Sequence, residues 1–127
     1  MLVVTRFDVP EDEAATFLVQ AQAALAAFAA RPGYVRGRLG RAADDATAYV
    51  LTTEWVGVGA YRRSLGAYDV KVDAAPLLAR GRDEPSAFEV LVSDEGRSGS
   101  ARAPGADTSA VGDSATSPRG PRGVRAP

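Results

Sequence analysis

Aromatic and arginine side chains are the groups in this 127-residue sequence that could build a site for chemistry. Aromatic rings can form the walls of an apolar pocket, and arginines can stabilise a negatively charged oxygen inside it. The candidates for a catalytic role are Trp55, Tyr61 and Arg62. The candidates for lining the pocket are Phe17, Tyr34, Arg36, Arg38 and Tyr68. We therefore expect any ligand to be a small aromatic molecule.

The aromatic candidates also fit a purely structural role. Trp55 ends a predicted strand, so it could instead anchor the core at the corner where the strand meets the next helix. Tyr61 and Tyr68 are spaced to share a helical face with Leu65, which is also the pattern of ordinary core packing.

The arginines of the second predicted strand leave two placements open. Arg36 and Arg38 alternate with Tyr34, so the three side chains are predicted to share one face of that strand. If this face meets the helices, the arginines need a bound anion or acidic partners such as Glu54 or Glu89. Otherwise they lie at the surface or at a dimer edge. Glu54 could act as a general base, or it could pair across the sheet with an arginine of this strand.

The sequence contains neither cysteine nor histidine. Disulfides, thiolate nucleophiles and cysteine-based metal sites are therefore excluded, and the usual neutral-pH base and haem ligand are missing. The adjacent acids Asp44 and Asp45 are better explained as turn residues than as a metal site. Gly57 and Gly59 resemble a dinucleotide loop, but Arg62 stands where a third glycine is needed. We predict no cofactor and no metal, and no residue is assigned as the general base.

Periodic apolar residues predict an α+β domain. Strands are expected at residues 2–8, 34–42, 48–55 and 87–92. Helices are expected from about 10 to 30 and 58 to 67, with a short turn of helix near residue 74. This β-α-β-β-α-β order is that of a ferredoxin-like sandwich, whose antiparallel sheet carries both helices on one face.

The predicted strands carry apolar residues on both faces. In the first strand, Leu2 and Val4 point to one side and Val3 and Phe7 to the other. A lone sheet of this kind would expose an apolar face, which a second copy of the chain could cover. We therefore expect a homodimer that forms through the sheet face.

Composition divides the chain into a domain at residues 1–93 and a tail at residues 94–127. The tail is rich in Gly, Ser, Pro and Arg and poor in large apolar residues, so it is predicted to be disordered. The net charge of −1 and the lack of a basic stripe argue against nucleic acid as a partner. No apolar stretch approaches the roughly 20 residues that span a bilayer, and no signal peptide is evident. We expect a cytoplasmic protein without a membrane partner.

Three local features occur in an order that matches a known family. The residues RPGY at 31–34 lead from the long helix into the second strand, and TTEW at 52–55 ends the third strand. The segment AYRRSL at 60–65 lies in the helix that follows at once. Through residues 1–92 the chain resembles the antibiotic biosynthesis monooxygenase-like group of dimeric α/β-barrel proteins.

The resemblance implies one of several activities. The family includes cofactor-independent monooxygenases that oxidise aromatic polyketide intermediates, haem-degrading monooxygenases and members of unknown activity. The haem-degrading branch uses an Asn on the first strand, a Trp on the second helix and a nearby His. This chain has Arg6 and Phe7 in the first region, Ser64 near the second, and neither Asn nor His anywhere. Classical haem degradation is therefore not expected.

Three functional hypotheses stay open. The first is a cofactor-independent monooxygenase-like protein that oxidises an aromatic or quinone-type metabolite. The second is a non-catalytic homodimer of the same fold that binds or senses a small molecule, because a fold does not determine a function. The third is a domain whose main role is assembly with another protein.

Overall fold

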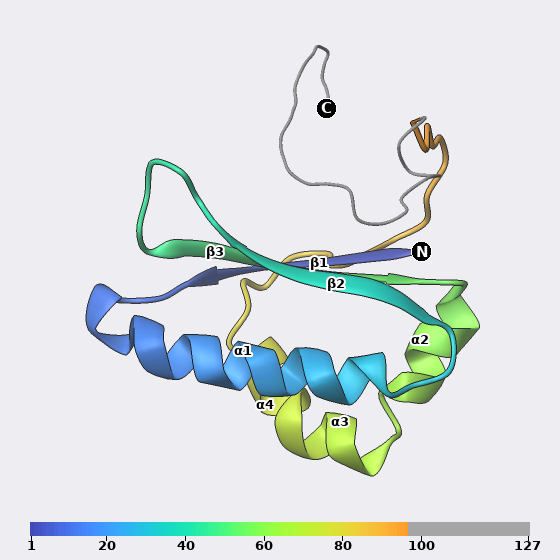
Figure 1. Ribbon diagram of the computed structural model, residues 1–127, viewed down its shortest axis with the longest axis horizontal. Coiled ribbons are helices and arrows are strands. Elements are labelled where there is room, and N and C mark those ends of the chain that lie inside the picture. The colour runs from blue at the N-terminus through green and yellow to red at the C-terminus, as the bar shows by residue number, and fades with distance from the viewer. Residues whose placement is uncertain (97–127) are drawn as a thin grey trace. The chain divides into compact units, whose positions relative to one another are not determined.

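Four antiparallel strands form the sheet of this computed structural model, which describes residues 1–96 (Figure 1). The strands are β1 (Leu2–Asp8), β2 (Tyr34–Arg41), β3 (Ala48–Trp55) and β4 (Ala87–Phe88). They lie side by side in the order β2-β3-β1-β4, and each neighbouring pair is antiparallel. The predicted α+β class and ferredoxin-like topology are confirmed. Apart from its first three residues, the predicted tail lies outside the described residues.

All the helices cover one face of the sheet (Figure 1). A 3-10 turn, η1 (Glu11–Glu13), leads into α1 (Ala14–Ala29), and three short helices follow β3. These are α2 (Val58–Ser64), α3 (Tyr68–Asp73) and α4 (Ala75–Leu78). The acidic side chains of η1 sit at the beginning of the helical segment, where the peptide dipoles favour negative charge.

Helix α1 buries one face against the sheet. Phe17, Ala21, Ala24 and Phe28 are buried against the sheet, whereas Leu18 is 43% exposed. The spacing of four, three and four residues keeps the buried set on one face. Leu18 lies about 100° around the helix from Phe17, which turns it toward the helix edge.

The predicted helix at 58–67 is wrong in its last three residues, and a separate helix begins just beyond them. Helix α2 ends at Ser64, and Ala67 has an extended backbone with ψ of 143° before α3 begins at Tyr68. Gly66 between them weakens helix continuation. The break removes Tyr68 from the face that carries Tyr61, and α3 instead buries Val70.

Strand β3 supplies the central row of the core. Tyr49, Leu51, Thr53 and Trp55 are all buried, while the residues between them are half-buried on the opposite face. This is the alternation of a strand with one face in the core. Both neighbours of β3 are strands, so its backbone is paired along both edges and its inner side chains lie beneath the helices.

A β-bulge in β2 overturns the predicted face of Tyr34. Tyr34 pairs with Trp55, but the next pair along the ladder joins Arg36 to Glu54, which leaves Val35 as an extra residue. An extra residue shifts the alternation by one position. Tyr34 therefore faces the helices, whereas Arg36 lies on the opposite side of the sheet with Glu54.

Strand β4 is shorter than the predicted strand at 87–92. Its two residues pair with Leu2 and Val3 of β1, and the segment before it also runs along β1. The Arg82 amide donates to the Arg6 carbonyl at 2.8 Å, and the Val4 amide donates to the Ser86 carbonyl at 2.7 Å.

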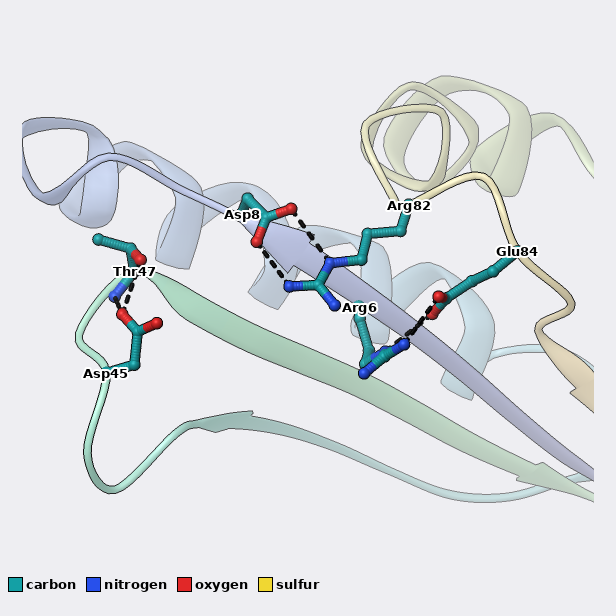
Figure 2. A network of polar contacts seen from close by, with 6 residues as sticks. All are labelled: Arg6, Asp8, Asp45, Thr47, Arg82 and Glu84. Atoms are coloured by element: carbon teal, nitrogen blue, oxygen red, sulfur yellow. Dashed lines mark hydrogen bonds and ion pairs between the residues drawn. The ribbon is translucent and has the colours of Figure 1, made fainter.

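Two bidentate ion pairs hold this segment against β1 (Figure 2). Arg6 donates through Nε and Nη2 to the two carboxylate oxygens of Glu84, both at 2.8 Å. Arg82 donates to the Asp8 carboxylate at 3.1 and 2.8 Å. Two parallel hydrogen bonds in each pair fix the orientation of both side chains. We call the Arg6–Glu84 and Arg82–Asp8 pairs the edge clasp.

The outer face of the sheet, opposite the helices, is mixed in character. Leu2, Val4 and Val50 form a half-buried apolar band, and the partly exposed Phe88 pairs beside Leu2. Charged pairs flank this band, among them the edge clasp and a 2.7 Å contact between Arg36 Nη1 and Glu54 Oε1. The predicted ion pair of Glu54 with an arginine of the second strand is confirmed.

Candidate functional site

Four aromatic rings meet at the end of the sheet where β3 passes into α2. The ring of Trp55 lies 5.7 Å from that of Phe28, 5.4 Å from that of Tyr34 and 5.6 Å from that of Tyr61, measured between centroids. The first two contacts are edge-to-face, which is the favoured arrangement of aromatic pairs. The structure thus brings together three of the predicted site residues, from β2, β3 and α2.

Two glycines allow this cluster to close. Gly33 has a φ of +87°, and a Cβ there would collide with Ala60 of α2, so the turn after α1 can approach α2 only with glycine. Gly37 leaves room for the Tyr34 hydroxyl and for Leu25, whose Cδ2 would lie 2.6 Å from an added Cβ.

Trp55 is enclosed by the aromatic cluster. Its side chain is 2% exposed, and its indole N–H donates to the Thr53 hydroxyl at 2.9 Å. A buried indole whose donor is already used has no group left to offer a ligand. The structural alternative for Trp55 is therefore the one observed, and its effect on a site passes through Tyr61.

An open pocket of about 340 Å³ lies between α2 and the β1–β4 edge. Tyr61 and Arg62 line it from α2, together with Val58 and Leu65. The opposite wall is formed by Met1, Ala87, Phe88 and Glu89. The pocket is thus apolar along most of its wall and carries a hydroxyl, a guanidinium and a carboxylate, which is the usual composition of a small-molecule site.

Burial keeps the tyrosine hydroxyls of the cluster protonated. Desolvation raises the pKa of Tyr61 above its ordinary value of 10.0, and it does the same for Tyr34. A phenol whose pKa lies above 10 remains neutral at physiological pH and can donate a hydrogen bond. Tyr61 therefore serves this pocket as a donor.

Four of the other predicted residues lie away from this pocket. Phe17 is fully buried and contacts Phe7 and Tyr49, six residues or roughly 20 Å along β3 from Trp55. Tyr68 is 78% exposed at the start of α3. Arg36 and Arg38 lie on the outer face of the sheet, because the bulge in β2 turns them away from the helices.

Glu89 is the charged lining residue that the sequence did not predict to be in the site. The prediction considered it as a partner for Arg36 or Arg38, whereas the structure sets it opposite α2. The signal available was its position in the last strand, two residues beyond Ala87, on the same predicted face. This position predicts which face of the strand Glu89 shares, but it does not predict that a pocket lies there.

Neither a metal-binding cluster nor a membrane-spanning helix is found among the described residues. No group of three or more acidic side chains within residues 1–96 is arranged to hold a metal ion. Over the same range, none of the helices has the length and apolar character needed to cross a membrane.

The sequence profile of the antibiotic biosynthesis monooxygenase family matches residues 1–71, which is more than half of the chain. The chain belongs to this family. The matched region contains the aromatic cluster and both α2 residues of the pocket, Tyr61 and Arg62, whereas Glu89 lies beyond it. A search among curated proteins gives no significant match.

Solved structures agree with this family assignment. The chain is 29% identical to a mutant of SnoaB, a cofactor-independent oxygenase from Streptomyces nogalater. That match covers 72% of this chain and 93% of the SnoaB chain, with a TM-score of 0.59. Rv0793 from Mycobacterium tuberculosis shares the fold at 20% identity, with 76% of this chain and 96% of that chain covered and a TM-score of 0.56.

Proposed function

We propose that this family member is a cofactor-independent monooxygenase that oxidises an aromatic or quinone-type metabolite with dioxygen. The observation that carries the proposal is the pocket in which the Tyr61 hydroxyl and the Arg62 guanidinium share one wall. The family profile and the likeness to a cofactor-independent oxygenase support the reaction class.

The chemistry requires a substrate that supplies its own electrons. An electron-rich hydroxyaromatic molecule loses a proton, and the resulting anion reduces dioxygen: one oxygen atom forms a bond to a ring carbon of the substrate, and the other leaves as water. Arg62 stabilises the negative oxygen of the anion, and Tyr61 donates a hydrogen bond to it. Trp55 holds the Tyr61 ring from behind, through the contact at 5.6 Å.

The size and walls of the pocket suit a planar ligand of moderate size. Its volume of about 340 Å³ falls near the lower end of the range for small-molecule sites. Val58 and Leu65 offer apolar surface for an aromatic ring, while the polar groups orient its oxygens.

A homodimer formed through the outer sheet face is part of the proposal. The band of Leu2, Val4, Val50 and Phe88 would be covered by the same band of a second copy, and the flanking charges would lie around it. An apolar centre with a polar rim is the usual anatomy of a protein interface.

The test is oxidation of a panel of anthrones and hydroquinones under air, followed by quinone absorbance and oxygen uptake. We expect at least one compound to be oxidised far faster than in buffer, with Tyr61→Phe and Arg62→Gln each slowing turnover about 10-fold or more. Tyr68→Phe and Arg63→Gln are matched controls, because neither residue lines the pocket. No acceleration by the wild-type protein across the panel would overturn the oxygenase proposal.

A binding function without catalysis is the second candidate. It is favoured by the scarcity of proton acceptors, since Tyr61 and Arg62 both act as donors and Glu89 is the single carboxylate among the described lining residues. Tight binding of the same compounds without oxygen uptake would select this function. The two candidates are thus separated by measuring affinity and turnover on one panel.

A further inference from the structure

Arg62 and Glu89 line the same pocket, and neither forms an ion pair with any described residue. The four ion pairs within residues 1–96 join other arginines to other acids, such as Arg36 to Glu54 on the outer face. Two charged groups of opposite sign that share a pocket without pairing there leave both available to a ligand.

The end of β4 places Glu89 beside the pocket. Ala87 pairs with Val3, which is 4% exposed and faces the helices. Glu89 directly follows β4, and it lines the pocket together with Ala87. There it lies across the pocket from α2, which carries Arg62.

We propose that Glu89 is the proton acceptor of the site. The inference rests on the proposed function and assigns its missing base. The O–H bond of the substrate hydroxyl breaks, the proton passes to a carboxylate oxygen of Glu89, and the electron pair stays on the substrate oxygen beside Arg62. The anion formed in this way is the species that dioxygen oxidises in the next step.

The other polar groups of the pocket cannot take this role. Burial raises the pKa of the Tyr61 phenol, which favours its protonated form, and the Arg62 guanidinium offers only N–H donors. Met1 also lines the pocket, but its ammonium group donates to the Trp55 carbonyl at 3.0 Å. A carboxylate is ordinarily a weaker base than a phenolate, so the transfer depends on Arg62 to stabilise the product anion.

The test uses a hydroxyanthraquinone whose anion absorbs at longer wavelength than its neutral form. It is titrated with the full-length protein about one pH unit below the pKa of the free dye. With the wild-type protein we expect the bound dye to show the anion band. In the wild type the dye proton should stay on Glu89, so that binding releases none to the buffer. In Glu89→Gln, whose neutral amide stands in for the protonated acid, the dye should still bind as its anion and should release about one proton per dye to the buffer. Glu11→Gln, which removes an exposed acid from η1, is the matched control.

The outcomes separate this inference from the proposed function. A dye that binds the wild-type protein in its neutral form, or whose anion releases its proton to the buffer in the wild type, overturns the role of Glu89 and leaves the pocket intact. Failure of every dye to bind the wild-type protein overturns both. For an oxidised substrate, we expect Glu89→Gln to lower kcat about 100-fold with little change in KM, the size expected for a general base. Equal melting curves for Glu89→Gln and the wild type would show that the variant is folded.

Discussion

The ring of Trp55 lies against the ring of Tyr61, with centroids 5.6 Å apart and an angle of 55° between the planes. One ring is buried in the core and the other borders the pocket. This contact links the stability of the domain to the shape of the site, because Tyr61 can hold its position only while Trp55 fills the space behind it.

Truncation of Trp55 is predicted to lower the free energy of unfolding and, at the same time, to remove the support that holds the Tyr61 ring in position. Trp55→Ala removes the centre of the aromatic cluster and should cost about 3–5 kcal/mol of unfolding free energy, as is typical of large-to-small core changes. Trp55→Phe keeps part of the contact and should cost less. Urea denaturation followed by circular dichroism measures both. A loss below about 1 kcal/mol for Trp55→Ala would contradict the packing described here.

An alanine at Gly37 is predicted to destabilise the domain by about 1–3 kcal/mol, because its Cβ would collide with Leu25 and with the Tyr34 hydroxyl. Gly40→Ala is the matched control in the same strand, since a Cβ there meets only Val50, at an ordinary 3.4 Å. Thermal melting of the two variants compares them directly. Equal melting temperatures would mean that Tyr34 does not occupy the space above Gly37.

The edge clasp is predicted to weaken in acid. Hydrogen bonds from Arg82 lower the pKa of Asp8, and those from Arg6 lower the pKa of Glu84. A carboxyl group whose pKa is lower in the folded state stabilises the fold above its unfolded value, about 3.9 for Asp and 4.3 for Glu, and this stabilisation is lost as the pH falls through the folded value.

Amide exchange can detect the loss of the clasp. At neutral pH the Arg82 amide should be protected in the wild-type protein, because it donates to the Arg6 carbonyl, and Glu84→Gln should reduce this protection. Lowering the pH below about 4 should reduce the difference between the two proteins, once intrinsic exchange rates are corrected. Protection that is the same in both proteins at neutral pH would argue against the clasp.

The proposed dimer predicts a mass of twice 13.2 kDa in sedimentation experiments at micromolar concentration. Val50→Lys places a charge within the outer apolar band and should shift the protein toward the monomer. Leu18→Lys is the control, because Leu18 is partly exposed on the helical side. A wild-type monomer at these concentrations would refute the sheet-face interface.

Sequence periodicity predicts a strand and its buried face correctly where the local pattern agrees with the burial in the folded domain. The bounds of the strand at 48–55 and the inward face of Tyr49, Leu51, Thr53 and Trp55 follow directly from alternation. The ion pair of Arg36 with Glu54 could also be predicted from the sequence, because residues of opposite charge lie on neighbouring strands.

The remaining differences depend on contacts that a linear pattern does not contain. The bulge at Val35 changes the face of Tyr34 without changing the composition of β2. The break at Gly66 and Ala67 separates Tyr68 from Tyr61, although their spacing fits one continuous helix. Glu89 enters the pocket only because β4 lies beside β1 and opposite α2, which is a relationship between distant segments.

The bulge at Val35 has a consequence for how this strand can change in evolution. Deleting that single residue would leave Tyr34 and Arg36 adjacent in a regular strand, and adjacent side chains point to opposite faces, as these two already do. A one-residue deletion is therefore compatible with the sheet, whereas a regular strand of unchanged length would turn Tyr34 to the outer face. Among relatives, a one-residue gap at this position should therefore leave an aromatic residue at Tyr34 in place.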